Sequence, residues 1–411
     1  MSKSEKTCIL FTNSFPYGHD ENFIEKEVPF LSKYFEKVEI YSLNTSHETP
    51  KVLPSNVSMI SWQASFKFSS RQLIIKHWIL LIKVFYQEFK HQPKHTLSSF
   101  RGLLSDFLHQ IRRAESMINA LKKYDISSLV LYSYWMDRWA SVLSIVKHYH
   151  PQFDFISRAH AFDLYEEDNR NAYIKFRKFQ FQNIKHVYTV SHHGEDYLKL
   201  KYPQWGSKIS TAYLGVIQHD FVNAMPDDKE LKIVSCGSVQ DRKRIKEIPQ
   251  ILSQLNTPFH WIHFGDGGEM DLLISNIKKH QIEDKVTLMG HVQNDVFLSY
   301  LKNEPVSFFL SLSRNEGLPY TMMEAISFGI PIIATDAMGC REICTVQTGI
   351  LLPLNDDSKS VSQAIEKFAQ STLNTEAFRT GVKNFWKENF EAENNNFKFY
   401  KKIENTVTPS T

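Results

Sequence analysis

The chain has 411 residues, of which 42% are hydrophobic and 23% are charged, and its formal net charge is +3. This length favours two domains, and the nearly balanced charge with ample apolar material excludes a disordered or collagen-like chain. The four scattered cysteines include no Cys-x-x-Cys pair, which argues against a disulfide framework or a zinc finger and favours a reducing, cytosolic setting.

The N-terminal segment is not typical of a signal peptide. Only the short apolar stretch 8–11 follows the first lysines, and no later segment approaches the roughly 18 uninterrupted apolar residues of a spanning helix. We therefore expect neither secretion nor membrane spanning.

The first half alternates between strand and helix patterns. Residues 7–15 predict a strand that ends in a Pro-Tyr-Gly turn, residues 21–35 predict a helix, and residues 38–43 predict a second strand. Further strands are predicted at 127–134, 153–160 and 186–191, each followed by helix-like sequence. This order predicts an α/β sheet with helices on both faces.

Between Ser65 and Tyr124 the chain is strongly basic, with eleven Lys/Arg against three acids, a surplus of eight. Within it, residues 71–90 show helical apolar spacing, with Leu73, Trp78, Leu81 and Phe85 on the apolar face and lysines interrupting every long apolar run. Two interpretations stay open: a core helix with a solvated basic edge, or an amphipathic helix that docks on an anionic membrane surface. Nucleic acid is not expected, because no nucleic-acid motif accompanies the patch.

The second half repeats the strand and helix rhythm after a polar stretch near Ala224. Five strands, at 231–238, 259–267, 285–292, 306–313 and 331–336, alternate with helices and predict a parallel doubly wound sheet. We predict three segments: an N-terminal domain over 1–224, a second domain over 225–382, and a closing helix and loose tail over 383–411.

Glycine is concentrated in this second half, where ten of the fifteen glycines lie from Gly237 onward. Because glycine leaves no Cβ between the backbone and a ligand, this distribution favours a small-molecule or phosphate site there.

The most informative segment is SLSRNEGLPYTMMEAISFGIPIIATD, residues 311–336. A strand ends at Ser313, a turn carries Glu316, and a helix begins near Pro319 with Glu324 inside it. The backbone N–H groups of the turn and the first helical residues, Gly317, Leu318, Tyr320 and Thr321, are expected to form an anion site at the end of a parallel strand. Glu316 then stands before this site and Glu324 behind it.

This segment resembles the retaining glycosyltransferases of family 4, whose pattern is Glu, seven residues, Glu. Glu316-Gly317-Leu318-Pro319 matches the first part of that pattern, and Glu324-Ala325 through Gly329 and Pro331 matches the second. The resemblance covers about residues 8 to 365.

Other landmarks of that family have counterparts here. Lys243 stands where the family keeps the lysine that binds the donor diphosphate, and His160 matches the histidine that lies over the reacting sugar. The resemblance also implies donor contacts, beyond the segment above, from Gly18 in the N-terminal loop, Gly265 and Asp266 in a glycine-rich turn, and His291 on the nucleobase side. The family's usual arginine is replaced by Ser238, so either Arg242 or Arg244 supplies that charge, or the diphosphate is bound more weakly than is usual in the family.

The resemblance implies the GT-B architecture, two Rossmann-like domains facing each other across a cleft, with a C-terminal helix that crosses back to the first domain. It implies transfer of a sugar from a nucleotide diphosphate donor with retention at the anomeric carbon. Lys243 and the helix N-terminus can stabilise the leaving diphosphate, so no metal or other cofactor is expected, and no Asp-x-Asp triplet occurs. Whether Glu316 is a nucleophile or orients sugar hydroxyls stays open, and we favour orientation.

We expect a cytoplasmic enzyme, peripheral to the inner face of the membrane, whose acceptor is an envelope or exopolysaccharide-type glycan, lipid-linked or polymeric. Two alternatives remain: a nucleotide-sugar epimerase of the same architecture, and a non-catalytic membrane adaptor. Two of these residues also have a structural interpretation without a role in catalysis. Lys243 lies in a basic run typical of solvated helix starts, and His160 could be a core histidine.

Overall fold

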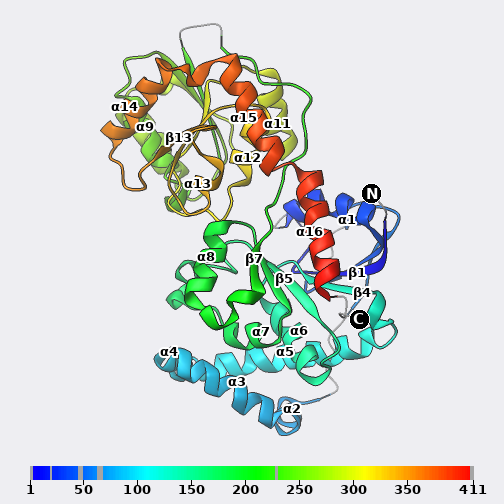
Figure 1. Cartoon of the computed structure of the whole chain (residues 1–411). Coiled ribbons are helices and arrows are strands. Elements are labelled where there is room, and N and C mark those ends of the chain that lie inside the picture. Colours follow the sequence, from blue (N-terminus) through cyan, green and yellow to red (C-terminus); the bar gives the residue numbers. More distant parts are fainter. Residues whose placement is uncertain (1–2, 19–20, 45–49, 63–67, 227–229, 408–411) are drawn as a thin grey trace. The chain divides into compact units, whose positions relative to one another are not determined.

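The computed structural model describes residues 3–18, 21–44, 50–62, 68–226 and 230–407. Lys67 of the basic stretch, residues 227–229 of the predicted linker and residues 408–411 of the predicted tail lie outside the described residues. The chain, drawn in Figure 1, divides into two compact units. The first unit holds Met1–Val190, Gly194–Ala212 and Asn396–Thr411, and the second holds Ser191–His193 and Tyr213–Asn395.

Within the described residues, the first unit contains a seven-stranded parallel sheet with the order β3-β2-β1-β4-β5-β6-β7. Its strands are β1 (Ser4–Thr12), β2 (Phe35–Ser42), β3 (Val57–Met59), β4 (Leu129–Ser133), β5 (Phe155–Ala159), β6 (His186–Thr189) and β7 (Ile209–Thr211). The central strands β4 and β5 are buried along their whole length, as parallel strands covered on both faces are.

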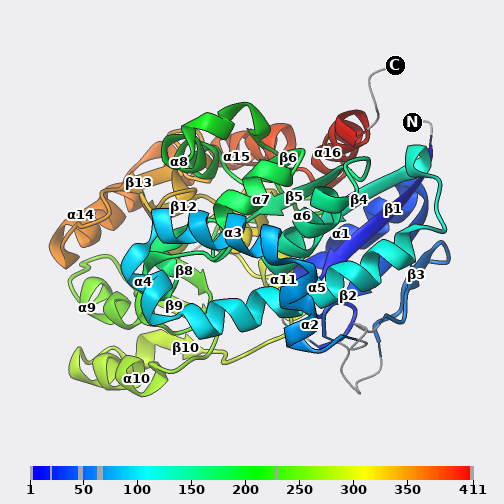
Figure 2. The ribbon, with the colours of Figure 1, turned by 90° about the horizontal axis from the view of Figure 1, so that it is seen from below.

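Helices cover both faces of this sheet. They are α1 (Asn22–Tyr34), α2 (Ser70–Lys76), α3 (Trp78–His91), α4 (Pro93–Ser98), α5 (Phe100–Leu121), α6 (Arg138–Tyr149), α7 (Arg177–Asn183), α8 (His192–Lys201) and α16 (Ala392–Val407) from Asn396 onward. On one face α1 and α16 form a core with β1, β2 and β4. On the other face the ring centroids of Trp139 in α6 and Phe11 in β1 lie 4.8 Å apart. The helix α5, which can be followed in Figure 2, packs on α6.

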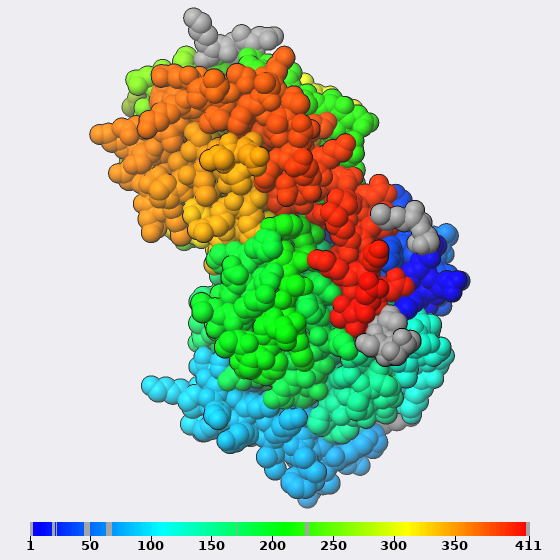
Figure 3. Space-filling model, viewed as in Figure 1, coloured from blue at the N-terminus to red at the C-terminus, as the bar shows by residue number. Residues whose placement is uncertain are grey.

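The C-terminal helix belongs to the first unit from Asn396 onward and covers a buried ion pair. Arg158 of β5 and Glu27 of α1 are 3.0 Å apart, and both are almost fully buried. The ring of Phe399 lies 4.2 Å from the guanidinium of Arg158, and the hydroxyl of Tyr400 lies 3.3 Å from the Glu27 carboxylate. Because a buried charge needs a partner and protection from water, α16 completes this core. In Figure 3 its red surface lies against the blue N-terminal part of the chain.

The second unit contains, within the described residues, a six-stranded parallel sheet with the order β10-β9-β8-β11-β12-β13. Its strands are β8 (Leu231–Cys236), β9 (Phe259–Phe264), β10 (Val286–Leu288), β11 (Phe308–Ser311), β12 (Ile332–Thr335) and β13 (Gly349–Leu352). Its helices are α9 (Ile248–Leu252), α10 (Met270–Lys279), α11 (Asn294–Asn303), α12 (Tyr320–Ser327), α13 (Cys340–Ile343), α14 (Ser358–Ala369) and α15 (Glu376–Asn389). The five strands predicted for this half are present, and β13 is a sixth.

Short 3-10 helices complete both units. They are Ile126–Ser128, Glu166–Asp168, Arg170–Ala172, Pro203–Lys208, Asp241–Lys243, Ile245–Glu247, Glu283–Lys285 and Thr372–Asn374.

The observed units differ from the predicted domain limits at 224 and 382. The segment after Tyr213 belongs to the second unit because Asn223 binds there: its side-chain amide donates to the carbonyls of Leu301 and Glu304, and its side-chain oxygen accepts from the backbone N–H of Val306. At the other end α15, half of which falls in the predicted closing segment, packs on α12 of the second unit. The polar composition near Ala224 predicts a linker, but the long-range hydrogen bonds of Asn223 place this segment in the second unit.

The predicted helix over 71–90 breaks at His77 into α2 and α3. The buried imidazole of His77 contacts the hydroxyl of Tyr149 at 2.7 Å and the carboxylate of Glu115 at 3.0 Å, which ties the break to α5 and α6. The predicted apolar face packs inward at Leu73, Leu80, Leu81 and Val84, which are buried, whereas Trp78, predicted on the same face, is more than half exposed. Among the described residues, none of the helices has the length and apolar character needed to cross a membrane.

In each sheet the strand order reverses beside one strand. β1 lies between β2 and β4, and β8 lies between β9 and β11. The chain therefore builds each sheet first on one side of its first strand and then on the other side, and the loops after β1 and β4, or after β8 and β11, lead away from each other. Such a reversal opens a crevice at the carboxyl ends of the strands, where open α/β sheets bind ligands.

Candidate functional site

Lys243 and Glu316 meet at the switch point of the second sheet. Lys243 ends a 3-10 turn, Asp241–Lys243, in the loop after β8, and Glu316 lies in the loop after β11, the neighbouring strand. The ammonium of Lys243 donates to Oε1 of Glu316, and the hydroxyl of Ser313 donates to the same oxygen at 2.8 Å. Both side chains are largely but not fully buried, so they remain open to a ligand.

The loop that carries Glu316 leads directly into α12. Leu318 is buried, Pro319 is the extended residue before the helix, and Tyr320 is the first helical residue, so the helix N-terminus follows Glu316 and Gly317 as predicted. Gly339 holds this loop from the side. Its backbone N–H donates to the carbonyl of Glu316 at 3.0 Å, and a Cβ there would lie 2.0 Å from the carbonyl oxygen of Gly317, so only glycine fits.

Glu324 lies on the second turn of α12 and is almost fully buried. Its Oε1 accepts a hydrogen bond of 3.0 Å from the side-chain amide of Asn294 at the start of α11. Burial and the nearby charge of Glu324 together raise the pKa of the Cys236 thiol to about 12, although the charge of Lys243 opposes this. The carboxylate of Glu324 therefore lies near the end of β8, the strand that Cys236 closes.

The glycine-rich loops after β8 and β9 touch each other through their backbones. Gly265 has φ of 146°, and a Cβ there would lie 1.9 Å from the carbonyl oxygen of Gly237. Its N–H donates to the carbonyl of Gly290 after β10 at 2.8 Å. Asp266 and His291 follow these contacts on the exposed side of the loops. The backbones of these three loops therefore lie in direct contact at the carboxyl ends of β8, β9 and β10.

Arg242 and Arg244, the two candidates to replace the arginine that is missing at Ser238, lie in different environments. Arg244 is buried, and its guanidinium binds the Glu247 carboxylate at 2.8 Å and the carbonyl of Leu354 at 3.1 Å. These contacts hold it away from Lys243, so it does not join the cluster. Arg242 is exposed next to Lys243, and Ser238 is half-buried in the same loop.

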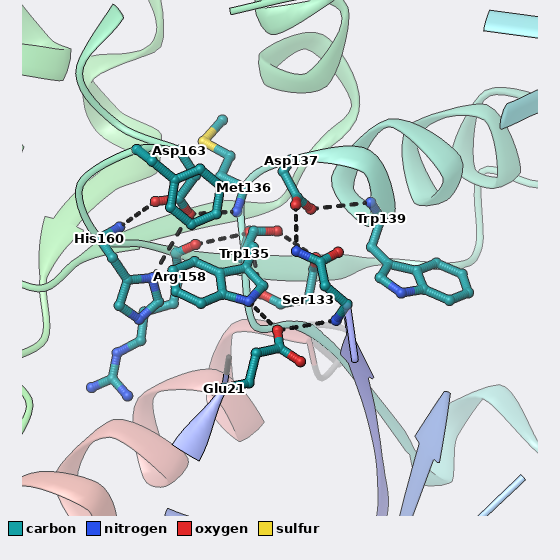
Figure 4. A network of polar contacts seen from close by, with 12 residues as sticks. Glu21, Ser133, Trp135, Met136, Asp137, Trp139, Arg158, His160 and Asp163 are labelled. Atoms are coloured by element: carbon teal, nitrogen blue, oxygen red, sulfur yellow. Dashed lines mark hydrogen bonds and ion pairs between the residues drawn. The ribbon is translucent and has the colours of Figure 1, made fainter. Parts of the chain in front are cut away.

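In the first unit Glu21 holds the loop after β1. Its buried carboxylate accepts from the backbone N–H groups of Asn13, Ser14 and Phe15, at 3.1, 2.6 and 2.6 Å, and from the indole of Trp135. Figure 4 shows Glu21 joining this loop to Trp135 in the loop after β4. Gly18 closes the same loop with φ of 64°.

His160 follows β5, and its ring packs against Trp135, the residue whose indole donates to Glu21. Its ring stacks on Tyr134 at 4.9 Å and lies 4.4 Å from Trp135. Asp163 fixes its loop: one carboxylate oxygen accepts from the N–H of His160 at 2.8 Å and the other from the N–H of Met136 at 2.9 Å (Figure 4). Burial opposes ionisation of Asp163, but hydrogen bonding and the charge of His160 outweigh it and lower its pKa below the usual range.

The structure therefore gathers the predicted residues into two groups. Lys243, Glu316 and the start of α12 form one group in the second unit, and His160 and Gly18 lie at the strand ends of the first. Among the described residues, no group of three or more His, Cys, Asp or Glu side chains is arranged to hold a metal ion.

Four supporting residues were not assigned to the site from sequence: Ser313, Gly339, Asn294 and Trp135. Ser313 lies three residues before Glu316 and could have been found by that spacing. The others reach the site from separate elements, and no local pattern marks them.

Residues 217–384 match the family model of glycosyl transferases group 1, a stretch that lies within the second unit. The chain is 28% identical over 171 residues to the GtfA subunit of the UDP-N-acetylglucosamine–peptide N-acetylglucosaminyltransferase of Streptococcus pneumoniae, covering 38% of this chain and 31% of that protein. It is 29% identical over 135 residues to the lipopolysaccharide 1,6-galactosyltransferase of Escherichia coli, covering 32% of this chain and 38% of that protein. The chain thus matches about a third of the length of these relatives.

The apo structure of the lipopolysaccharide outer core galactosyltransferase WaaB is similar over 97% of this chain and 98% of its own, with a TM-score of 0.70 and 14% identity. At this identity the likeness concerns the fold alone. It confirms the predicted fold class, two Rossmann-like domains of the GT-B type.

Proposed function

We propose that this protein is a retaining glycosyltransferase that moves a sugar from a nucleotide diphosphate sugar to an envelope or exopolysaccharide-type acceptor. The observation that carries this proposal is the contact of Lys243 with Glu316 at the sheet's switch point, directly before the N-terminus of α12. The match of this unit to glycosyl transferases group 1 supports it, as do relatives whose names specify transfer of N-acetylglucosamine or galactose.

Each group has a chemical task in this proposal. The ammonium of Lys243 and the first amides of α12 balance the negative charge that develops on the departing diphosphate. Glu316 holds Lys243 in place and orients hydroxyls of the transferred sugar, while Glu324 accepts hydrogen bonds from the ribose. Because positive charge is already supplied by Lys243 and the helix, the transfer is expected to proceed without a divalent cation. The acceptor attacks from the side of the leaving group, with His160 over the sugar.

The test is a panel of nucleotide sugars offered with and without glycan acceptors. We expect nucleoside diphosphate release in proportion to acceptor glycosylated, an α-linked product from an α-linked donor by NMR, and unchanged rates after EDTA treatment. An epimerase would instead change the donor without an acceptor, and an adaptor would release no diphosphate.

We further propose that the first unit docks on an anionic membrane surface through the outer face of α2 and α3. This face exposes an apolar stripe at helical spacing, with Ile75, Trp78, Ile79, Ile82 and Tyr86 each more than half exposed. Lysines and arginines interrupt the stripe and flank it, namely Arg71, Lys83, Lys90, Lys94 and Arg101, all exposed.

An exposed apolar stripe of this kind is unusual on a water-facing surface. The Lys and Arg residues beside the stripe favour an anionic bilayer as its binding partner, since each Lys or Arg near such a surface contributes about 1 kcal/mol of attraction. Docking would hold the first unit, which the proposal assigns to acceptor binding, at the membrane surface that carries the acceptor.

A further inference from the structure

A second group of charged residues in the first unit lies outside the site described above. It lines a cavity of about 670 Å³ beyond the carboxyl ends of β4 and β5. One wall is a face of α5, where Asp106, His109 and Arg113 recur at helical spacing. Asp137 and Arg138, at the start of α6, form another part of the wall. The loop of Asp163 also lines it, so the cavity adjoins the loop that begins at His160.

The carboxylates in this cavity already have partners. Asp106 forms an ion pair with Lys175. Asp163 accepts from two backbone N–H groups, and Asp137 accepts from the side-chain amide of Asn13 at 2.8 Å and from the N–H of Trp139 at 3.4 Å. Burial and the charge of Asp163 nevertheless raise the pKa of Asp137 to about 6, against the effect of these hydrogen bonds and of the charge of Arg138.

The two guanidiniums differ from the carboxylates in this respect. Among the residues that the structure describes, Arg113 and Arg138 make no hydrogen bond and no ion pair with a carboxylate. Both residues line the cavity, with Arg113 half-buried and Arg138 exposed. Burial lowers the pKa of Arg113, and the charge of Arg138 lowers it further, whereas the carboxylate of Asp106 opposes this shift, so the two cations are near enough to repel each other. The N-terminus of α6, a helix of 12 residues, adds partial positive charge at Arg138. An anion of more than one charge would relieve this repulsion.

We propose that Arg113 and Arg138 form an anion site that binds a phosphate or diphosphate group of the acceptor. Guanidinium groups suit this ligand because their planar donors make paired hydrogen bonds to phosphate oxygens. The exposed His109 on the same helix face can supply a further donor. The assignment to the acceptor rests on the proposed glycosyl transfer, whereas the anion site itself does not.

The site can be tested by direct binding, without turnover. Calorimetry on the full chain would use two probes, inorganic pyrophosphate as a free anion and farnesyl diphosphate in detergent as a lipid-borne one. A Lys243→Ala background removes binding at the other anion site. In that background we expect Arg113→Gln and Arg138→Gln each to weaken binding about tenfold or more.

Lys122→Gln is the charge control, because Lys122 is an exposed cation at the C-terminal end of the same helix and lies outside the cavity lining. It should leave pyrophosphate binding unchanged, and Arg113→Lys should retain part of it. The probe that binds more tightly identifies whether the natural anion is free or lipid-borne. The proposal is overturned if Lys243→Ala alone abolishes binding of both probes, or if folded Arg113→Gln binds them as tightly as its parent. Loss of transfer activity with binding intact would count against the proposed function and not against this site.

Discussion

Lys243 is the residue on which the proposed chemistry depends most. If its ammonium balances the departing diphosphate, Lys243→Ala should lower kcat/KM by about 100-fold or more, the range seen when one donor to a developing anion is removed. The matched control is Lys246→Ala, because Lys246 lies in the same basic run but binds Asp241 at 2.9 Å and Glu269 at 2.6 Å instead. Equal losses in the two variants, measured by steady-state kinetics, would remove Lys243 from the mechanism.

The two glutamates are predicted to act on different parts of the donor. Glu324→Gln should weaken binding of the donor's nucleoside diphosphate about tenfold, since a charged acceptor to the ribose is lost. Glu316→Gln should mainly lower kcat, because the neutral amide no longer fixes Lys243 or the sugar. Titration of both variants with that nucleoside diphosphate separates the roles. The assignment is wrong if Glu316→Gln loses the affinity and Glu324→Gln keeps it.

Glu88 of α3 is predicted to make stability depend on pH. It is 1% exposed, and burial raises its pKa from about 4.5 to about 7. The folded chain therefore binds this proton more tightly than the unfolded chain, so the stability from Glu88 is full below pH 4.5 and is lost as pH rises to 7. Glu88→Gln should be more stable than the parent at pH 8, by on the order of 3 kcal/mol from 1.36 kcal/mol per pKa unit, and similar at pH 4.5.

Thermal unfolding at the two pH values measures this difference. Glu283→Gln, an exposed site, serves as the control and should show no gain at pH 8. A Glu88→Gln variant with the same pH profile as the parent would show that Glu88 is ionised in the folded chain without cost.

At the scale of elements, α2 and α3 carry apolar residues on two faces, one packed inward and one exposed. If the exposed face enters a bilayer, Ile79→Asp with Ile82→Asp should abolish co-sedimentation with anionic vesicles, while Leu200→Asp, an exposed leucine of α8, should not. Lys83→Glu with Lys90→Glu should weaken binding most at low salt, since screening acts over about 8 Å at physiological ionic strength.

Lys278→Glu with Lys279→Glu on α10 is the charge-matched control. Equal recovery of the unchanged chain with neutral and anionic vesicles at low salt would reject membrane docking of this face.

At the scale of the whole molecule, the last helix, α16, packs in the same core as the first strand and the first helix, so its packing should affect the stability of the first unit. Tyr400 and Ile403 of α16 are fully buried in the core of the first unit with residues of β1 and α1. Tyr400→Ala should destabilise that unit by about 3 kcal/mol through the cavity and the exposure of the Arg158–Glu27 pair.

Hydrogen exchange measured by mass spectrometry can assign this loss to a unit. Amides of β1 and β4 should exchange faster in Tyr400→Ala, whereas those of β8 and β11 should not change, and Lys401→Ala, at an exposed neighbour, should affect neither. Equal acceleration in both units would mean that they unfold as one.

Local patterns in the sequence determined much of the fold. Hydrophobic runs separated by helical periodicity identified most strands of both sheets, because burial on both faces leaves a local mark in composition. The Glu316 and Glu324 spacing placed one carboxylate before a helix and one inside it, since a helix start fixes both positions over a few residues. The roles assigned to these residues, and to His160, stay predictions.

Long-range packing decided the rest. Arg242 and Arg244 are equivalent in sequence, yet a glutamate and a distant carbonyl hold Arg244 in the core and leave Arg242 exposed. Both faces of α3 are apolar, so only the tertiary structure shows that Leu81 faces inward and Ile82 outward. Arg113 of α5 and Arg138 at the start of α6 line the same cavity, although they belong to different helices. Such contacts depend on how helices and strands that are distant in the sequence pack together, and local sequence patterns do not determine this packing.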